Sequence, residues 1–150
     1  MPVCLKRPWG EIYFFTSGLT LYSPPEQLKK SMKILICESE EVLLAAIEFR
    51  LRKQGFDVAF CKKKASVEEH VIKEDPDLVL IDLDMGKQSG LEIVRLVKQL
   101  QGDKAKTLLL ADPDEEEQIV EGFSIGINDF LSKPFKPAEL ILRVRRILGK

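Results

Sequence analysis

The chain has 150 residues, 45% of them hydrophobic and 31% charged, with a net charge of −1. This length favours one domain with a substantial core, and the composition excludes a disordered chain. A net charge near zero provides no basic field, so we expect neither nucleic acid nor a membrane as a partner. No stretch approaches the roughly 20 apolar residues of a membrane span. Three cysteines without metal-ligand spacing favour the reducing cytoplasm.

Residues 1–31 differ in composition from the rest of the chain. They hold four of the eight prolines and five of the eleven aromatic residues. Four basic and two acidic side chains give them a charge of +2, against −3 from the 19 basic and 22 acidic side chains of residues 32–150. No helix or strand period persists across the prolines. We expect an irregular N-terminal extension: ill ordered, lying upstream of a true start at Met32, or docking through its aromatic residues.

From Met32 onward, short apolar runs alternate with amphipathic segments. The expected strands span residues 33–37, 56–60, 78–81, 107–110 and 127–131. Three of the expected helices span residues 66–73, 91–100 and 137–148. Another is capped by Ser39 and ends before Gly55, and a fifth is capped by Asp112 with Pro113 at its first position. Strict alternation of strand and helix predicts a parallel sheet covered on both faces, with right-handed crossovers.

Carboxylates follow the third expected strand, which is apolar throughout and therefore predicted to be buried on both faces. Asp82 ends this strand, Asp84 comes two residues later, and a turn closes at Gly90. In open α/β sheets, ligands bind at the carboxyl ends of the strands. Asp82 is therefore either a reactive group at that edge or, as a single strand-ending acid often is, a solvated loop residue.

The order and spacing of these pieces resemble the receiver domain of two-component response regulators across residues 32–150. The matching pieces are Glu38 after the first strand, Asp82 after the third, Gly90, and 133–135 (Lys-Pro-Phe) after the fifth. Residues 126–140 are especially similar to the winged-helix transcription-factor branch of this family. The resemblance implies a flavodoxin-like, doubly wound α/β fold whose five-stranded parallel sheet has the order 2-1-3-4-5.

The resemblance also implies a role for each matching residue. Asp82 would be the phosphoacceptor, and Lys133 the cation that offsets charge on the phosphoryl group. Mg²⁺ would be held by Glu38, by Asp82 and by the backbone carbonyl of Asp84. Phe130 would be the aromatic residue that changes rotamer on activation.

Two positions depart from the family pattern. Where the family has a pair of aspartates after the first strand, this chain has Glu38 and Ser39, so we expect weak Mg²⁺ binding. Where the family has Thr or Ser at the end of the fourth strand, this chain has Ala111, which cannot donate a hydrogen bond to a phosphoryl oxygen. The coupling between phosphorylation and the Phe130 switch is therefore expected to be impaired.

An acid on the fifth strand and an Arg on the last helix pair across a two-fold dimer in the winged-helix branch. Asp129 and Arg143 occupy these positions. A companion pair of that dimer would fall at Glu121 and Glu139, where two acids would repel, so the homodimer is only one option.

Three functional hypotheses follow. The first is a stand-alone receiver, not an enzyme, that accepts a phosphoryl group at Asp82 from a histidine kinase or phosphotransfer protein and acts on a downstream protein by contact. The second, motivated by Ser39 and Ala111, is a degenerate receiver that binds partners without phosphorylation. The third starts from residues 82–84 (Asp-Leu-Asp), which resemble the nucleophile motif of haloacid-dehalogenase-type phosphatases. That family carries the motif on its opening strand, not its third.

Overall fold

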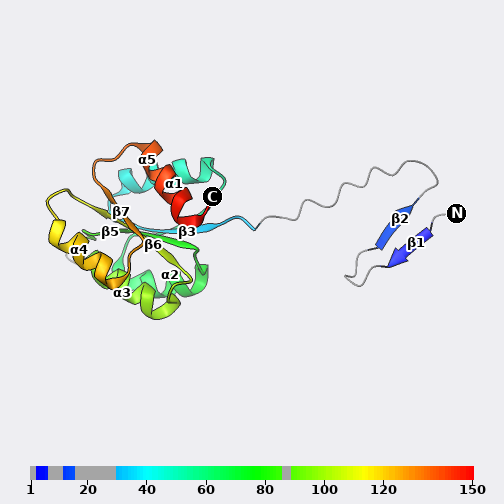
Figure 1. Cartoon of the computed structure of the whole chain (residues 1–150), viewed down its shortest axis with the longest axis horizontal. Helices are drawn as coiled ribbons and strands as arrows, with labels where there is room; N and C mark the ends of the chain where they lie inside the picture. Colours follow the sequence, from blue (N-terminus) through cyan, green and yellow to red (C-terminus); the bar gives the residue numbers. More distant parts are fainter. Residues whose placement is uncertain (1–2, 7–11, 16–29, 86–88) are drawn as a thin grey trace. The chain divides into compact units, whose positions relative to one another are not determined.

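The computed structural model describes residues 3–6, 12–15, 30–85 and 89–150, and the chain divides into two units, Met1–Lys30 and Ser31–Lys150 (Figure 1). In the first unit, strands β1 (Val3–Lys6) and β2 (Ile12–Phe15) pair antiparallel. The expectation of a wholly irregular extension is therefore wrong for these residues. They are mostly β-branched or aromatic, which favours strands, and Pro8 and Gly10 lie between them in sequence, not within them.

The second unit is built on a five-stranded parallel sheet in the order β4-β3-β5-β6-β7. Numbered within this unit the order is 2-1-3-4-5, which confirms the predicted doubly wound, flavodoxin-like fold. The strands are β3 (Lys33–Cys37), β4 (Asp57–Cys61), β5 (Leu78–Asp82), β6 (Lys106–Ala111) and β7 (Asp129–Ser132).

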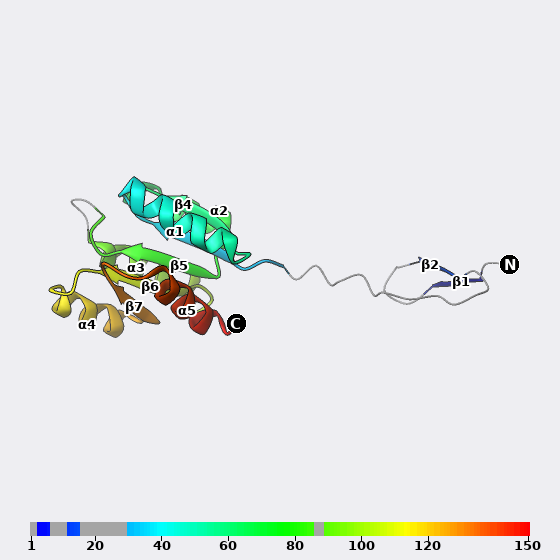
Figure 2. The same ribbon diagram turned by 90° about the horizontal axis from the view of Figure 1, so that it is seen from above.

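Helices cover both faces of this sheet, as Figures 1 and 2 show. Helices α1 and α5 lie on one face, and α2, α3 and α4 lie on the other. Their bounds are α1 (Glu41–Lys53), α2 (Val67–Glu74), α3 (Gly90–Gln101), α4 (Glu116–Ile125) and α5 (Pro137–Leu148), with a short 3₁₀ turn η1 (Lys64–Ser66) before α2. None of the helices in the described residues is both long and apolar enough to cross a bilayer.

Strand β5 is buried on both faces, as its sequence predicts. Leu78 and Leu80 belong to the hydrophobic cluster under α1 and α5, whereas Val79 and Ile81 belong to the cluster under α2, α3 and α4. Because side chains alternate along a strand, one apolar run fills two core layers. The packed core on both faces of the sheet therefore fixes the end of β5, and with it Asp82.

The starts of two helices differ from the sequence prediction. Ser39 does not cap α1. The helix begins at Glu41, and Glu40 occupies the cap position without a capping hydrogen bond from its side chain. Helix α4 begins at Glu116, not at Pro113. A turn precedes it, in which the backbone N–H of Asp112 donates to Oε2 of Glu115 at 2.7 Å and the N–H of Glu115 donates to the Asp112 carbonyl at 3.1 Å. These bonds satisfy the polar groups locally, so the helix starts later.

Candidate functional site

The candidate site lies at the carboxyl ends of β3, β5 and β7, where Asp82 is the central residue. Its side chain is almost fully buried, since the residue is 2% exposed. Lys133, directly after β7, places its Nζ 2.9 Å from Oδ2 and 3.1 Å from Oδ1 of Asp82. The backbone N–H of Asp84 donates to Oδ1 at 2.8 Å. Both carboxylate oxygens therefore accept hydrogen bonds from groups that favour negative charge.

A backbone hydrogen bond to the neighbouring strand positions Lys133. Its N–H donates to the carbonyl of Ala111, at the end of β6, at 2.8 Å. Burial lowers the pKa of Lys133, but the hydrogen bond and charge of Asp82 outweigh it, with help from the charges of Asp112 and Glu38, and the pKa lies above its usual value. Lys133 therefore remains an ammonium beside Asp82 across the physiological pH range.

Glu38 brings a second buried carboxyl group to the site. It follows β3, is 1% exposed, and its Oε1 accepts the backbone N–H of Glu40 at 2.8 Å. Its Oε2 is buried and has no hydrogen-bond partner among the described residues. Burial, then the neighbouring Asp82, raises the pKa of Glu38 to about 8, although the Glu40 N–H and Lys133 oppose the shift. At neutral pH Glu38 therefore largely retains its proton in the metal-free protein.

The geometry brings together three of the predicted site residues: Asp82, Lys133 and Glu38. The side chain of Asp84 is exposed and lies outside this group, and only its backbone N–H touches Asp82. Ala111 is fully buried at the end of β6, in register with Ser132. Its methyl group has no hydrogen-bonding capacity, so Ala111 contributes only its carbonyl to the site.

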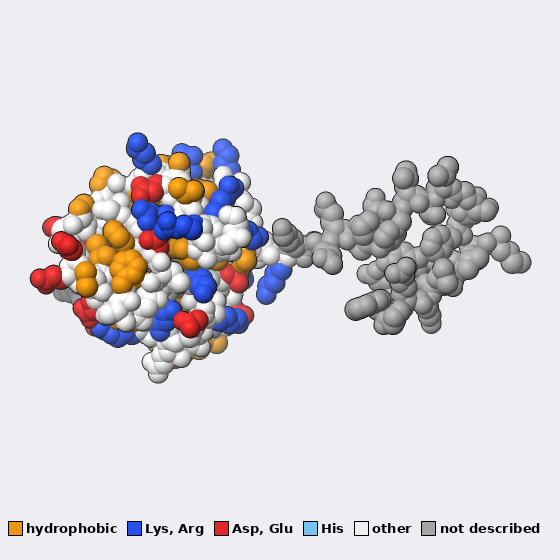
Figure 3. All heavy atoms as spheres, in the orientation of Figure 1, with side chains coloured by type: hydrophobic (Ala, Val, Ile, Leu, Met, Phe, Trp, Pro, Cys, Tyr) orange, Lys and Arg blue, Asp and Glu red, His pale blue; other side chains and the backbone are white. Residues whose placement is uncertain are grey.

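Phe130, the predicted switch residue, is half-buried on β7. Its ring meets the ring of Phe123 edge to face, with 6.1 Å between centroids and 88° between planes. The sequence analysis missed Phe123, because only the packing of α4 beside β7 brings the two aromatic residues together. Exposed hydrophobic side chains gather over α4 in Figure 3, where Val120 and Phe123 are the large exposed apolar residues of that helix.

Asp129 and Arg143, predicted as a dimer pair, bind each other within one chain. Nη1 of Arg143 lies 3.1 Å from each oxygen of Asp129, and Arg146 also bonds to Asp129. The two acids expected to repel have partners of their own: Glu139 binds Arg143 at 3.1 Å, and Glu121 binds Arg95. The intramolecular pairs satisfy these charges without a second protomer.

Glu38 and Asp82 are the side chains that suit a divalent cation here. Glu38 offers a buried oxygen that lacks a partner, and Asp82 offers two oxygens that face Lys133. Within residues 30–85 and 89–150, no group of three or more His, Cys, Asp or Glu side chains is arranged around one metal position. Two carboxylates fit Mg²⁺, which commonly takes one or two of them and keeps several waters.

Comparison with known proteins defines the class to which this fold and site belong. The sequence profile of the response regulator receiver domain matches residues 34–145. The chain is therefore a member of the response regulator receiver domain family.

Individual relatives agree with this assignment. The alkaline phosphatase synthesis transcriptional regulatory protein PhoP of Bacillus subtilis (strain 168) is 32% identical over 118 residues, which cover 79% of this chain and 49% of PhoP. The chain thus spans about half the length of this relative. A crystal structure described as a response regulator from Chloroflexus aurantiacus J-10-fl matches with a TM-score of 0.74 and 28% identity, covering 81% of this chain and all of that one.

A further solved structure is similar in fold. It is the receiver domain of the sensor histidine kinase PA1611 from Pseudomonas aeruginosa PAO1, with a TM-score of 0.70 and 24% identity over 80% of this chain and 99% of that chain. That structure has a magnesium ion coordinated in its active site cleft.

Proposed function

We propose that Asp82 accepts a phosphoryl group from a phosphohistidine of a histidine kinase or phosphotransfer protein, and that this receiver then acts on a downstream protein by contact. The observation that carries the proposal is the position of Lys133 Nζ within 3.1 Å of both oxygens of the buried Asp82. A carboxylate held beside one ammonium, at the rim of a parallel sheet, is suited to nucleophilic attack on phosphorus.

The proposed transfer uses these residues in defined roles. An oxygen of Asp82 forms a bond to phosphorus as the bond from phosphorus to the histidine nitrogen breaks, and the electron pair leaves with the imidazole ring. Charge develops on the equatorial phosphoryl oxygens, and the ammonium of Lys133 offsets part of it. Lys133 is already in place before the reaction, so little reorganisation is needed.

Glu38 and Asp82 are the residues that we propose to hold Mg²⁺, with the carbonyl of Asp84 as the third protein contact. When bound, Mg²⁺ supplies positive charge that draws the phosphoryl oxygens toward the carboxylate. Glu38 must lose its proton to act as a ligand, and Ser39 contributes no charge, so we propose weak binding.

Phosphorylation can be tested with a small acyl phosphate and Mg²⁺ on the full chain. Intact-mass spectrometry should show one added phosphoryl group, and Asp82→Asn should abolish it. Asp84→Asn is the matched control, because it removes a neighbouring carboxylate that is exposed and should leave the adduct in place. An unmodified wild-type mass at every Mg²⁺ concentration would contradict the proposal.

A second candidate function is phosphorylation-independent binding, and the observation that favours it is Ala111. A hydroxyl at this position would bind a phosphoryl oxygen, and deletion of one such donor in other sites costs roughly 3–4 kcal/mol of stabilisation. If this candidate is right, Asp82→Asn will leave partner binding and the cellular phenotype unchanged. A strong phenotype of that variant would support the phosphoacceptor instead.

For the downstream partner, we propose the face that carries Val120 and Phe123 on α4, next to Phe130. This face exposes apolar surface, and a rotation of the Phe130 ring would alter its contact with Phe123.

A homodimer through β7 and α5 would require Arg143 to exchange its intrachain bond with Asp129 for one across the two-fold axis. We propose no catalytic turnover: the acid motif of residues 82–84 lies on the third parallel strand of this unit, and hydrolysis of a chromogenic phosphate ester would overturn that view.

A further inference from the structure

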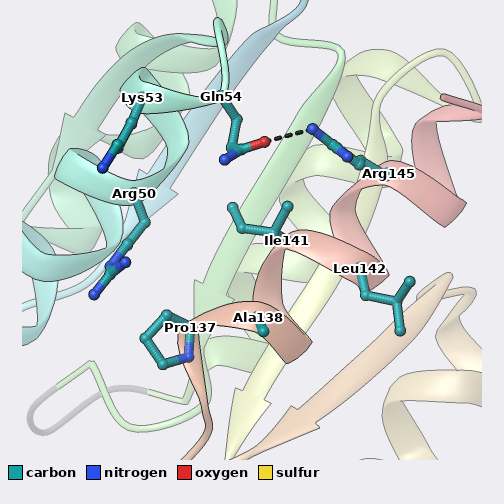
Figure 4. Close-up of a pocket in the computed structure, with 8 residues that line it drawn as sticks. All are labelled: Arg50, Lys53, Gln54, Pro137, Ala138, Ile141, Leu142 and Arg145. Carbon is teal, nitrogen blue, oxygen red and sulfur yellow. Dashed lines mark hydrogen bonds between the residues drawn. The ribbon is translucent and has the colours of Figure 1, made fainter.

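We infer that the groove between α1 and α5 binds an acidic, partly apolar segment of a protein partner. The groove has a volume of about 440 Å³ and is lined by residues of these two helices and by Gln54, directly after α1 (Figure 4). None of Asp82, Lys133 and Glu38 lines it. This binding site is therefore independent of the proposed phosphoryl transfer.

Three cations surround the groove. Arg50 and Lys53 come from the last turns of α1, and Arg145 comes from the last turn of α5. The described residues that line the groove include no carboxylate. All three cations are exposed. The groove therefore carries concentrated positive charge although the whole chain has a net charge of −1.

These cations lack acidic partners among the described residues. The side chains of Arg50 and Lys53 make no hydrogen bond or ion pair to residues 30–85 or 89–150, and Arg145 bonds to the amide oxygen of Gln54, as Figure 4 shows. Arg52 on the same helix is different: it binds Glu48 and the carbonyl of Val58. Favourable interaction with the dipoles at the ends of α1 and α5 accounts for each of these cations in part, but the two helices bring all three to one groove.

Apolar side chains make up the rest of the lining. Pro137, Ile141 and Leu142 line the groove on the side of α5. Leu142 is 69% exposed and therefore offers apolar surface to a partner at this groove. A groove that combines cations with apolar contacts matches a segment in which carboxylates alternate with large apolar residues.

Charge distinguishes this occupant from the alternatives. A second copy docked by the same face would bring two sets of cations together, which is unfavourable. The chain's own first 31 residues carry a charge of +2, which does not complement these cations. A nucleic acid would use the cations but would leave the apolar side chains of α5 without partners.

The test uses the full 150-residue protein and a fluorescein-labelled synthetic peptide of alternating Glu and Leu. Fluorescence anisotropy should show saturable binding that weakens as salt increases. In ¹⁵N-labelled protein, the amide shifts should concentrate on α1 and α5. A peptide with Lys in place of Glu should not bind, and Asp82→Asn should bind as wild type does.

Two double variants that each remove two positive charges distinguish binding in the groove from general electrostatic attraction to the protein. Arg50→Gln with Arg145→Gln should weaken binding by about tenfold. The matched control is Lys63→Gln with Lys73→Gln, two exposed cations outside the groove that have no side-chain partner among the described residues, and it should bind as wild type does. Leu142→Ser, which leaves the charge unchanged, should also weaken binding.

Three outcomes would overturn the inference. The first is equal loss of affinity in both double variants, which would indicate diffuse charge attraction. The second is tighter binding of a single-stranded oligonucleotide of the same charge, with shifts on the same helices, which would indicate a nucleic-acid surface. The third is an absence of amide shifts on α1 and α5 with any of these probes.

Discussion

At the scale of single residues, the molecule places two buried carboxyl groups and one ammonium at the carboxyl edge of the sheet. Glu38 and Asp82 are each at most 2% exposed, and Lys133 is the cation that touches Asp82. Isolated charges in such a place would be strongly unfavourable, whereas a paired charge with hydrogen bonds is tolerated. The burial of two carboxyl groups beside one ammonium is therefore electrostatically unfavourable, and a cation bound at this site would reduce that cost.

The raised pKa of Glu38 makes the stability of the metal-free protein depend on pH. Its pKa is about 8 in the folded protein against 4.5 for the free group, so the native state binds a proton more tightly than the unfolded state does. The stabilisation from this group is complete below about pH 4.5 and is lost as the pH rises toward about 8.

Urea unfolding midpoints measured with a chelator should therefore fall across this pH range in the wild type, and Glu38→Gln should flatten the decline because glutamine does not titrate. Glu69→Gln, at an exposed carboxylate of α2, is the control and should keep the wild-type slope. Identical slopes in all three proteins would mean that Glu38 does not hold a proton in the folded state.

Ala111 is the residue that we expect to limit switching. Ala111→Ser adds a hydroxyl at the end of β6, at a stability cost of about 1–3 kcal/mol because the position is fully buried. After treatment with the small acyl phosphate and Mg²⁺, NMR shifts at Phe130 and Phe123 should be larger in this variant than in the wild type. Asp82→Asn combined with Ala111→Ser should show no such difference. Shifts of equal size in Ala111→Ser and in the wild type would contradict a role for the missing hydroxyl.

At the scale of elements, the junction between β5 and α3 fixes the position of Asp82. The N–H of Gly90 donates to the carbonyl of Leu83 at 2.7 Å, and Ser89 caps α3 through its side-chain oxygen. A Cβ atom on Gly90 would lie 2.3 Å from the carbonyl oxygen of Asp82 and 2.7 Å from Cα of Leu83. Only glycine permits the helix to begin so close to the end of the strand.

Gly90→Ala should therefore destabilise the protein by about 1–3 kcal/mol or more, because both opposing atoms belong to the backbone and cannot rotate away. It should also reduce phosphorylation of Asp82, whose backbone must shift. Gly149→Ala is the comparison: a Cβ there meets nothing within 4 Å, so its cost is limited to the left-handed backbone conformation (φ +70°). Denaturant unfolding of both variants provides the measurement, and a smaller loss for Gly90→Ala than for Gly149→Ala would refute the close approach.

At the scale of the whole molecule, the second unit contains two hydrophobic clusters, one on each face of its sheet. Among residues 30–85 and 89–150, whose burial the structure describes, the buried members of both clusters lie between Ile34 and Val144. The unit Ser31–Lys150 therefore contains its own complete α/β core, with β5 shared between the two layers. This organisation predicts that the first unit is not needed for folding.

Removal of residues 1–30 should leave the thermal midpoint within about 2 °C of the full chain, because a change of 1 kcal/mol shifts the midpoint of a domain this size by roughly 2–8 °C. Differential scanning calorimetry of the two proteins tests this directly. A large fall in the midpoint would instead favour the alternative in which the aromatic residues of the first unit dock on the receiver domain.

Much of the fold follows from local pattern. The apolar runs at residues 33–37 and 78–81 could only be strands covered on both faces, and the alternation with helices selected a doubly wound parallel sheet. The starts of α1 and α4 were missed because the turn bonds of Glu38 and Asp112 with nearby residues outweigh the capping pattern. The pairing of β1 and β2 was missed because the prolines around them obscured two short β-prone segments.

The sequence by itself determined which residues end the strands, and hence that Asp82, Glu38 and Lys133 would meet at one edge, because parallel strands bring their carboxyl ends together. Only the tertiary structure decided the raised pKa of Glu38, the bond of Arg143 to Asp129 within one chain, and the cationic groove between α1 and α5. These depend on burial and on distances between residues far apart in the chain. The sequence pattern predicts which strands are buried, but it does not specify these distances.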